Sequence, residues 1–275
     1  MSGDLRAAVP LVLVGAGKMG GAMLAGWIER GLPANGVVIL DPNPAPEMAA
    51  LAAEKGLRLE TTPPADVTAA VILIAVKPQV MDAVLPTLRG LIGPETIAVS
   101  VAAGKTIASI EAGLGARAVV RAMPNTPAQV GRGITACAAN AAVTTPQRVL
   151  VTALLSAIGK VEWVATEDLI DAVTAVSGSG PAYVFLLAEA LAEAGRKAGL
   201  PADLAARLAR ATVEGAGELM FQSPLDPATL RKNVTSPNGT TAAALAVLMA
   251  DDALQPLMDA AVAAAANRSR ELSAG

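Results

Sequence analysis

The feature that most constrains this chain is a change of pattern near residue 166. Before it, short apolar runs alternate with helical patterns, which is typical of a parallel sheet with crossover helices. From Glu167 onward no segment has a convincing strand pattern, and long alanine-rich helices follow. We therefore predict an α/β domain at residues 1–165 and an all-α domain at residues 166–275.

The expected elements can be assigned to residue ranges. Strands are predicted at 9–14, 37–40, 71–76, 97–101, 118–121, 134–138 and 161–164. Helices of the first half are predicted at 19–30, 47–55, 80–89 and 146–158. In the second half they are predicted at 168–199, 202–220, 228–233 and 242–250, with a last helix after them.

Composition narrows the kind of core that the chain can build. Hydrophobic residues make up 53% of the 275 residues, but aromatic residues only 2%, so Ala, Val, Leu and Ile must form the core. The alanine-rich helices of the second half offer too little apolar surface for a core of their own. We expect them to pack against a second copy of the chain, which makes a homodimer.

Several classes of protein and of site are disfavoured. The net charge is −3 and no basic stripe is present, so nucleic acid is a poor candidate partner. Cys137 is the single cysteine and histidine is absent, which excludes a disulfide within the chain, a zinc site and imidazole catalysis. No signal peptide or membrane span is apparent, since the longest uncharged stretches, such as 172–188, are interrupted by Ser, Gly and Pro. These features predict a cytoplasmic protein without a metal site.

A glycine motif follows the first predicted strand and opens the first helix. It reads Gly15-Ala16-Gly17-Lys18-Met19-Gly20, which is GxGxxG in a strand–turn–helix setting. The first glycine permits the tight turn, the second lets the backbone approach a pyrophosphate, and the third lets the helix pack on the strand. The motif predicts a Rossmann-like domain that binds a dinucleotide; the alternative is a tight turn with no ligand.

Asp41 ends the second predicted strand. A carboxylate there can accept hydrogen bonds from the adenosine ribose, and it repels a 2′-phosphate. This favours NADH over NADPH. Since Pro42-Asn43-Pro44 follows, the alternative is that Asp41 simply starts a turn.

Three other loops that follow predicted strands are candidates for binding the same cofactor, because ligands of such sheets bind at the carboxyl ends of the strands. They are Ala75-Val76-Lys77-Pro78, Ala102-Ala103-Gly104 and Met123-Pro124-Asn125-Thr126-Pro127. Each alone is compatible with plain turn chemistry. Together they favour a cofactor cleft.

Two motifs of the helical half remain. The run Val234–Thr241 has four hydroxyls, a proline and an Asn-Gly pair, and it leads into an apolar helix. The free N–H groups at the start of that helix suit a carboxylate ligand. The alternative is that the run only caps the helix, since Ser, Thr and Asn are ordinary cap residues. The run Ser177–Pro181 either breaks a helix to admit a ligand or lets interlocked helices cross closely, and we favour the crossing.

Five motifs in this order resemble the pyrroline-5-carboxylate reductase family, the enzymes of the last step of proline biosynthesis. They are Gly15–Gly20, Ala75–Pro78, Arg121–Pro127, Val176–Tyr183 and Asn233–Thr241, and the resemblance spans residues 9–270. It implies a Rossmann domain and a helical domain that interlocks in a dimer, with dimers commonly assembling into decamers. It implies hydride transfer from NADPH or NADH to the C=N carbon of 1-pyrroline-5-carboxylate.

The resemblance also implies roles for individual residues. Ser236 and Thr241 are the catalytic candidates, with the substrate held by Ser236, Asn238, Gly239, Thr240 and Thr241. The cofactor-binding candidates are Gly15, Ala16, Gly17, Lys18, Met19, Gly20, Asp41, Asn43, Ala75, Val76, Lys77, Pro78, Ala102, Ala103, Asn125, Glu167 and Asn233. The chain departs from the family pattern at Asn238, which replaces a glycine, and at Asp41, where Ser or Thr is common.

The implied chemistry agrees with the composition. A protonated cyclic imine is a strong electrophile, so its reduction needs orientation and electrostatics more than a strong acid, and the absent histidine is no obstacle. Three alternatives stay open: another cyclic-imine reductase, a hydroxyacid-type dehydrogenase and a non-catalytic nucleotide-binding protein. Hydroxyacid dehydrogenases of similar layout have a catalytic lysine early in the interdomain helix, and residues 168–195 contain none, which disfavours that class. A non-catalytic nucleotide-binding protein is disfavoured because it has no need of a turn that anchors a substrate.

Overall fold

The computed structural model describes residues 4–274 and contains two compact units. The first unit extends to Gly178 and includes the end of the last helix from Ala266 onward, and the second runs from Ser179 to Ala265. All the strands lie in the first unit and the second is helical. The domain boundary between residues 165 and 166 stays a proposal, since it marks a change of sequence pattern.

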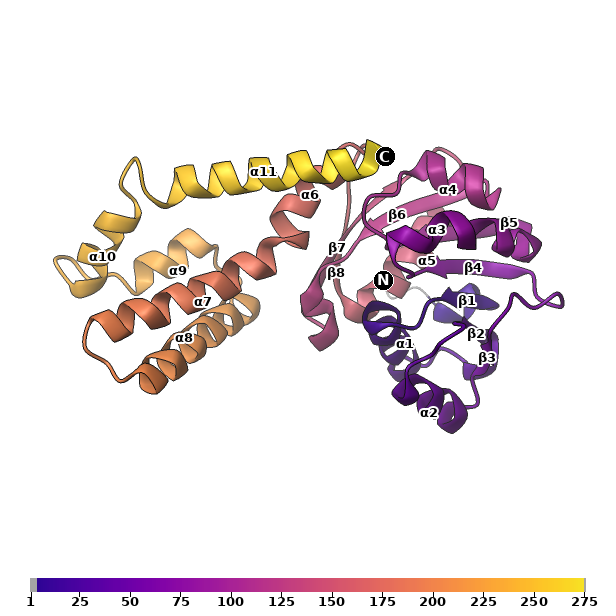
Figure 1. Ribbon diagram of the computed structural model, residues 1–275, viewed down its shortest axis with the longest axis horizontal. Helices are drawn as coiled ribbons and strands as arrows, with labels where there is room; N and C mark the ends of the chain where they lie inside the picture. Colours follow the sequence, from indigo (N-terminus) through magenta and orange to yellow (C-terminus); the bar gives the residue numbers. More distant parts are fainter. Residues whose placement is uncertain (1–3, 275) are drawn as a thin grey trace. The chain divides into compact units, whose positions relative to one another are not determined.

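The first unit is built on an eight-stranded sheet with the order β3-β2-β1-β4-β5-β6-β7-β8 (Figure 1). All neighbours are parallel except β6 and β7. The strands are β1 (Leu11–Val14), β2 (Val37–Leu40), β3 (Arg58–Glu60), β4 (Ala69–Ile74), β5 (Ile92–Ser100), β6 (Ala118–Met123), β7 (Gly133–Ala139) and β8 (Gly159–Trp163). Successive strands are added in one direction from β1 to β3 and in the other from β4 onward, so the boundary between β1 and β4 is the switch point where such sheets bind ligands.

Helices cover both faces of this sheet. Leu11 and Leu13 of β1 pack in one apolar cluster and Val12 and Val14 in another, because successive strand side chains point to opposite faces. The first cluster includes residues of α1 (Lys18–Glu29), α2 (Pro46–Lys55) and α5 (Thr145–Leu155). The second includes residues of α3 (Pro78–Val84) and α4 (Ile107–Leu114). The central strands β1, β2 and β4 are therefore buried on both sides, as continuous apolar runs indicate.

The first unit differs from its prediction in several places, among them the helix α4, which was not predicted. The strand β3 is short, half-buried and polar, so no apolar run marked it. Strand β7 is antiparallel to β6 because a short 3₁₀ turn at Thr126–Val130 joins them without a crossover helix. The helix predicted at 80–89 ends at Val84 and continues as 3₁₀ turns, since Pro86 restricts the residue before it.

The C-terminal segments are helical throughout the described residues, as predicted. They are α6 (Leu169–Val173), a π-helical turn (Thr174–Gly178), α7 (Gly180–Lys197), α8 (Ala202–Gln222), α9 (Pro227–Asn233), α10 (Thr240–Leu248) and α11 (Leu254–Ala274). The interruption predicted at Ser177–Pro181 is a π-helical turn followed by a new helix. Pro181 is tolerated because it lies in the first turn of α7, where its missing N–H is not needed.

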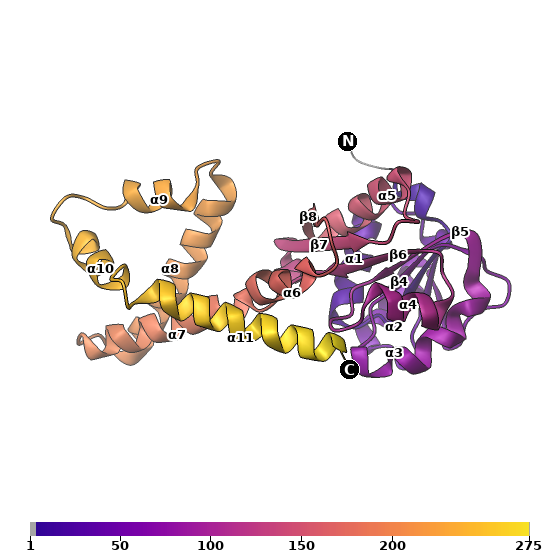
Figure 2. The ribbon, with the colours of Figure 1, turned by 90° about the horizontal axis from the view of Figure 1, so that it is seen from above.

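The helical unit buries little apolar surface on its own. Helices α7 and α8 pack against each other (Figure 2), yet α7 buries no residue and α8 only Ala205 and Ala209. Phe185, Leu186 and Leu187 are each more than half exposed. The segment Leu169–Lys197 is long and apolar enough to cross a membrane by length and composition alone, which is weak evidence. An apolar face with no cover in one chain equally fits packing against a second copy.

Candidate active site

The glycine loop after β1 is tight at both ends. Gly15 has a φ of +88°, and a Cβ there would lie 2.9 Å from Cγ1 of Val76. A Cβ on Gly20 would lie 2.2 Å from the carbonyl oxygen of Gly15, closer than real contacts allow. The Gly15 N–H donates to the Leu40 carbonyl over 2.9 Å, which fixes the loop to the end of β2. Gly15 and Gly20 therefore have the structural roles that the motif predicts.

The middle glycine is different, because space around it is open. Gly17 is the N-cap of α1, and a Cβ there would meet no atom within 4 Å. It offers no side chain to the first N–H groups of the helix, which begins at Lys18 and Met19. These donors and the positive end of the helix dipole form a cradle for an anion. This arrangement fits a dinucleotide pyrophosphate.

Asp41 lies between the glycine loop and the turn that follows β2. Its Oδ2 accepts a hydrogen bond from the Ala16 N–H and its Oδ1 accepts one from the Asn43 N–H, both over 2.9 Å. The turn interpretation of this residue is therefore observed, and the carboxylate also contacts the glycine loop. Its hydrogen bond to an adenosine ribose stays a prediction. The carboxylate is half-buried, so its negative charge is held at the edge of the predicted adenosine site.

Two more predicted loops leave the same edge of the sheet. The Ala75 N–H donates to the Val14 carbonyl over 2.8 Å, so the loop after β4 begins beside the end of β1. Lys77 is exposed and Pro78 opens α3. After β5, Ala102 is buried while Ala103 is exposed. Because β1, β4 and β5 are parallel, these loops all lie at their carboxyl ends.

Asn125 and Glu167 are tied to the protein itself. The Asn125 side chain accepts from the Ile134 N–H at 3.0 Å and donates to the Ser177 carbonyl at 3.2 Å. The Glu167 Oε1 accepts from the Ile107 N–H and from the Arg121 guanidinium, each over 2.9 Å. Their predicted contact with a cofactor stays a prediction, and their observed role is to join separate segments of the first unit.

Arg121 is a residue that the sequence reasoning did not assign to the site. Its side chain is only 4% exposed, and besides Glu167 it donates to the Ser273 hydroxyl at 3.4 Å. A lone arginine within the apolar strand Ala118–Met123 was the available signal, because a buried charge requires a partner. The pair joins β6, the start of α4 and the end of α11.

The candidate substrate turn has the conformation that its sequence requires. Asn238 has a φ of +58°, and the Gly239 N–H donates to the Ser236 carbonyl over 3.1 Å, as in a type II turn with proline at its second position. Asparagine tolerates this left-handed backbone better than most residues, so the turn is kept although Asn238 replaces a glycine of the family pattern. A Cβ on Gly239 would lie 2.3 Å from the Ser236 hydroxyl, so that hydroxyl lies against the glycine.

This turn leads directly into a helix with an open N-terminus. The helix α10 begins at Thr240, two residues before the predicted start, and its N-cap Gly239 provides no side-chain acceptor. Ser236 and Thr240 are exposed, and Thr241 is partly buried. Hydroxyls and free N–H groups thus lie together in the turn and at the start of α10, which suits a carboxylate.

The predicted site residues fall into two groups. All the predicted cofactor residues except Asn233 belong to the first unit, and Asn233 with the whole Ser236–Thr241 turn belongs to the second. Within the described residues, no cluster of three or more potential metal ligands is present. The chemistry available is thus a dinucleotide cradle in one unit and a carboxylate-binding turn in the other.

A glycine loop at the switch point of a doubly wound sheet defines the class of the chain as a dinucleotide-binding protein of the Rossmann type. Residues 10–104 match the family model described as "NADP oxidoreductase coenzyme F420-dependent", and residues 167–272 match the one described as "Pyrroline-5-carboxylate reductase dimerisation". The chain belongs to the pyrroline-5-carboxylate reductase family.

Full-length relatives establish that membership. The chain is 43% identical over 265 residues to a pyrroline-5-carboxylate reductase of Pseudomonas aeruginosa, covering 96% of each protein. It is 41% identical to one of Synechocystis, covering 96% of this chain and 98% of that protein. The agreement over nearly the whole length extends to both units, so the dimerisation segment is part of the resemblance.

Solved structures agree with the fold. A pyrroline-5-carboxylate reductase of Coxiella burnetii aligns with a TM-score of 0.88 at 34% identity, over 97% of this chain and 99% of that one. The enzyme of Plasmodium falciparum, solved with NADP bound, aligns with a TM-score of 0.77 at 27% identity, over 96% and 98%. The predicted α/β unit followed by a helical dimerisation unit is confirmed.

Proposed function

We infer that this chain reduces 1-pyrroline-5-carboxylate to L-proline with a nicotinamide dinucleotide, the last step of proline biosynthesis. One observation of the structure carries the substrate side of this proposal: the open N-terminus of α10, with the Ser236 hydroxyl held against Gly239. A substrate that carries a carboxylate and no phosphate matches this turn, because the turn offers hydroxyls and N–H groups but no cationic side chain.

The dinucleotide is assigned to the loops at the carboxyl edge of the sheet. In this proposal Gly15–Gly20 holds the pyrophosphate, and Asp41 and Asn43 hold the adenosine ribose. The rest of the dinucleotide lies along Ala75–Pro78, Ala102 and Ala103. Glu167 and Asn233 are assigned near the nicotinamide, and Asn125 is assigned to the dinucleotide without a particular part of it. When bound, the reduced nicotinamide supplies the hydride. The protein supplies position and excludes water.

The substrate carboxylate is anchored by Ser236, Asn238, Gly239, Thr240 and Thr241. A charge-assisted hydrogen bond of this kind contributes roughly 1.5–3 kcal/mol. Thr241 is partly buried at the start of α10. We assign it a hydrogen bond to the substrate and the relay of a proton to the ring nitrogen, and we assign Ser236 the opposite side of the carboxylate. Protonation of the imine makes its carbon electrophilic, so no strong acid from the protein is needed.

We propose that NADH is preferred over NADPH. The Asp41 carboxylate is held by the Ala16 and Asn43 N–H groups, where it meets a 2′-phosphate with like charge. Replacing Asp41 by Asn keeps an acceptor for the Ala16 N–H and removes the charge. We expect Asp41→Asn to shift the ratio of kcat/KM for NADPH and NADH by about tenfold toward NADPH. An unchanged ratio would remove Asp41 from cofactor selection.

The assembly is proposed to be a homodimer through the helical unit, with dimers joining into a larger ring such as a decamer. The site of action is proposed to be the cytoplasm, and no nucleic-acid or membrane partner is assigned. The exposed apolar side chains of α7 support the dimer, because one chain leaves them uncovered. Light scattering on a size-exclusion column measures the assembly directly.

The decisive assay follows the loss of NADH or NADPH absorbance with and without 1-pyrroline-5-carboxylate. Turnover only with the substrate, and more slowly with cyclic imines that lack the carboxylate, supports the assigned reaction. Equal turnover of an imine without a carboxylate contradicts the role given to the Ser236–Thr241 turn. No turnover with any imine, but tight dinucleotide binding, leaves the non-catalytic alternative.

A further inference from the structure

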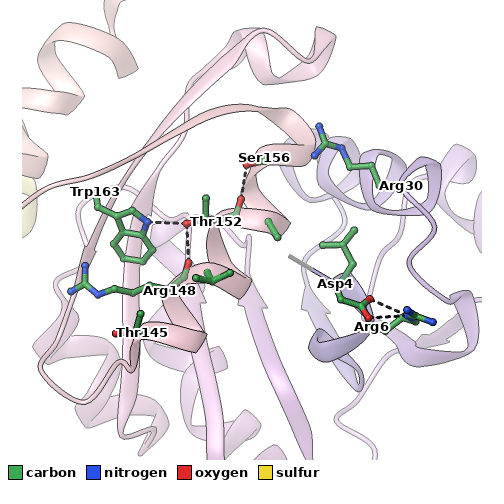
Figure 3. Close-up of a pocket in the computed structure, with 11 residues that line it drawn as sticks. Asp4, Arg6, Arg30, Thr145, Arg148, Thr152, Ser156 and Trp163 are labelled. Atoms are coloured by element: carbon green, nitrogen blue, oxygen red, sulfur yellow. Dashed lines mark hydrogen bonds and ion pairs between the residues drawn. The ribbon is translucent and has the colours of Figure 1, made fainter. Parts of the chain in front are cut away.

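A cavity in the first unit is separate from the loops of the proposed active site. It has a volume of about 1030 Å³ and lies between residues 4–6, α5, the end of α1 and the edge strand β8 (Figure 3). It is lined by Asp4, Leu5, Arg6, Arg30, Thr145, Arg148, Val149, Thr152, Ala153, Ser156 and Trp163. None of these residues belongs to the dinucleotide loops or to the substrate turn.

One whole face of α5 points to this cavity. The lining positions Thr145, Arg148, Thr152 and Ser156 recur at three- and four-residue spacing, which places them on one side of the helix. The opposite side, with Val151 and Leu154, is fully buried against the sheet. The cavity face is therefore the side of an amphipathic helix that points away from the sheet, and it carries hydroxyls and a guanidinium beside the apolar Val149 and Ala153.

The charge of the lining has the opposite sign to that of the chain. Three arginines and one aspartate line the cavity, and the only acid, Asp4, is paired with Arg6 over 3.0 Å. Within residues 4–274, Arg30 and Arg148 have no ion-pair partner. The protein as a whole has a net charge of −3, so this is a local concentration of positive charge.

The position of Arg148 is not explained by the fold alone. Arg30 caps the C-terminal end of α1, where a cation is stabilised by the helix dipole. Arg148 lies at the start of α5, whose first turn has no acidic residue, and there the dipole opposes a cation. Its guanidinium lies 4.7 Å from the centre of the Trp163 ring, which orients it but does not neutralise it.

A hydrogen-bonded chain holds this side of the cavity in place. The Trp163 Nε1–H donates to the Thr152 hydroxyl over 2.9 Å, and that hydroxyl donates to the Arg148 carbonyl over 2.8 Å. The Ser156 hydroxyl donates to the Thr152 carbonyl over 2.6 Å. Figure 3 shows Arg148 and Trp163 on one side of the cavity and Arg30, Asp4 and Arg6 on the other. Two unpaired guanidinium groups thus line one cavity, and hydrogen bonds hold the Arg148 side of it in place.

We propose that this cavity binds a small phosphorylated metabolite, held between Arg30 and Arg148. A phosphate group carries about two negative charges near pH 7, which matches the two unpaired arginines, and its oxygens match the guanidinium fork. The concave shape and its volume fit a small molecule rather than an extended polyanion. The proposal is independent of the reaction proposed above.

The test uses pyrophosphate, orthophosphate and acetate as probes in isothermal titration calorimetry. NAD⁺ and NADP⁺ are both kept at saturating concentration, so that the glycine loop is occupied and cannot take the probe. We expect saturable binding of pyrophosphate and weaker or undetectable binding of acetate. The double variant Arg30→Gln with Arg148→Gln should bind pyrophosphate at least about tenfold more weakly, because two charge-assisted contacts are lost.

Matched controls make the outcome decisive. Arg117→Gln removes one exposed charge of the same unit away from the cavity and should leave binding unchanged. Thermal melting of each variant checks that the fold is retained. Trp163 fluorescence provides a second readout, since the other tryptophan, Trp27, is fully buried. The proposal is overturned if binding does not saturate, if the double variant binds like the unmodified protein, or if Arg117→Gln weakens binding equally.

Discussion

The two units differ in how much of their own surface they bury. In the first, whole strands and the facing sides of five helices are buried, and Trp27, Leu11 and Leu13 are fully inaccessible. In the second, α7, α9 and α10 contain no buried residue. The first unit can account for its own stability, whereas the second needs a partner. Cofactor binding is thus assigned to the first unit, which buries its own core. Substrate binding is assigned to the second unit, whose apolar surface is left uncovered in a single chain.

The largest expected effect is on the incomplete unit. Leu187 is 57% exposed on α7, and we expect Leu187→Asp to prevent dimer formation and remove nearly all activity, because an unpaired charge cannot be buried cheaply in an apolar interface. Size-exclusion chromatography with light scattering measures this. The control Ala53→Asp places the same charge on an exposed position of α2 and should leave a dimer. A dimeric Leu187→Asp variant would place the interface elsewhere.

The glycine loop tests the self-contained unit. Gly20→Val should destabilise the fold by several kcal/mol and abolish dinucleotide binding, since its side chain would collide with the Gly15 carbonyl. Gly17→Ala meets no protein atom, so the melting temperature should stay the same while KM for the dinucleotide rises by about tenfold. Thermal melting and steady-state kinetics separate the two. A Gly17→Ala variant with unchanged KM would show that no ligand approaches at this point.

A smaller effect is expected at the substrate turn. Thr241→Ala should lower kcat/KM by about tenfold or more, consistent with the loss of one charge-assisted hydrogen bond. The control Thr235→Ala removes a neighbouring hydroxyl that is already bonded to the Arg231 carbonyl. Dinucleotide affinity should not change in either variant, because the turn belongs to the other unit. Kinetics like those of the unmodified protein in Thr241→Ala would exclude this residue from the mechanism.

The smallest effect concerns the core of the first unit. Burial raises the pKa of the Cys137 thiol from 9.0 to about 12, so the folded thiol stays protonated where the unfolded one ionises. The unfolded state then binds fewer protons, and the free energy of unfolding falls as pH rises between these values, by up to about 1.4 kcal/mol per pH unit.

Cys137→Ala should remove that contribution. Denaturant unfolding from pH 8 to about pH 10 measures the slope of the free energy of unfolding against pH, which should be more negative in the unmodified protein than in the variant. Below the ordinary pKa of a thiol, near 9.0, the two slopes should coincide. An identical slope above it would mean that the thiol is not sheltered as the structure indicates.

Local sequence was sufficient for most of the fold. The apolar runs at β1, β2 and β4, the glycine loop and the αL asparagine of the substrate turn each follow from residue types at short range. Strand β3 and the direction of β7 could not be predicted in this way. The first pairs through its backbone while exposing polar side chains, and the second depends on the length of a turn.

The sequence by itself determined a sheet that buries both faces of its central strands and the absence of imidazole chemistry, and it predicted a loop for a dinucleotide and a turn for a carboxylate. Those are properties of neighbours in the chain, and short-range sterics and periodicity encode them.

Only the tertiary structure decided what distant residues do to one another. It placed Glu167 between Ile107 and Arg121, attached Asp41 to Ala16, and brought Arg30 and Arg148 to one cavity. Such contacts join residues far apart in the chain, and the packing of helices on the sheet sets them, which no local pattern records.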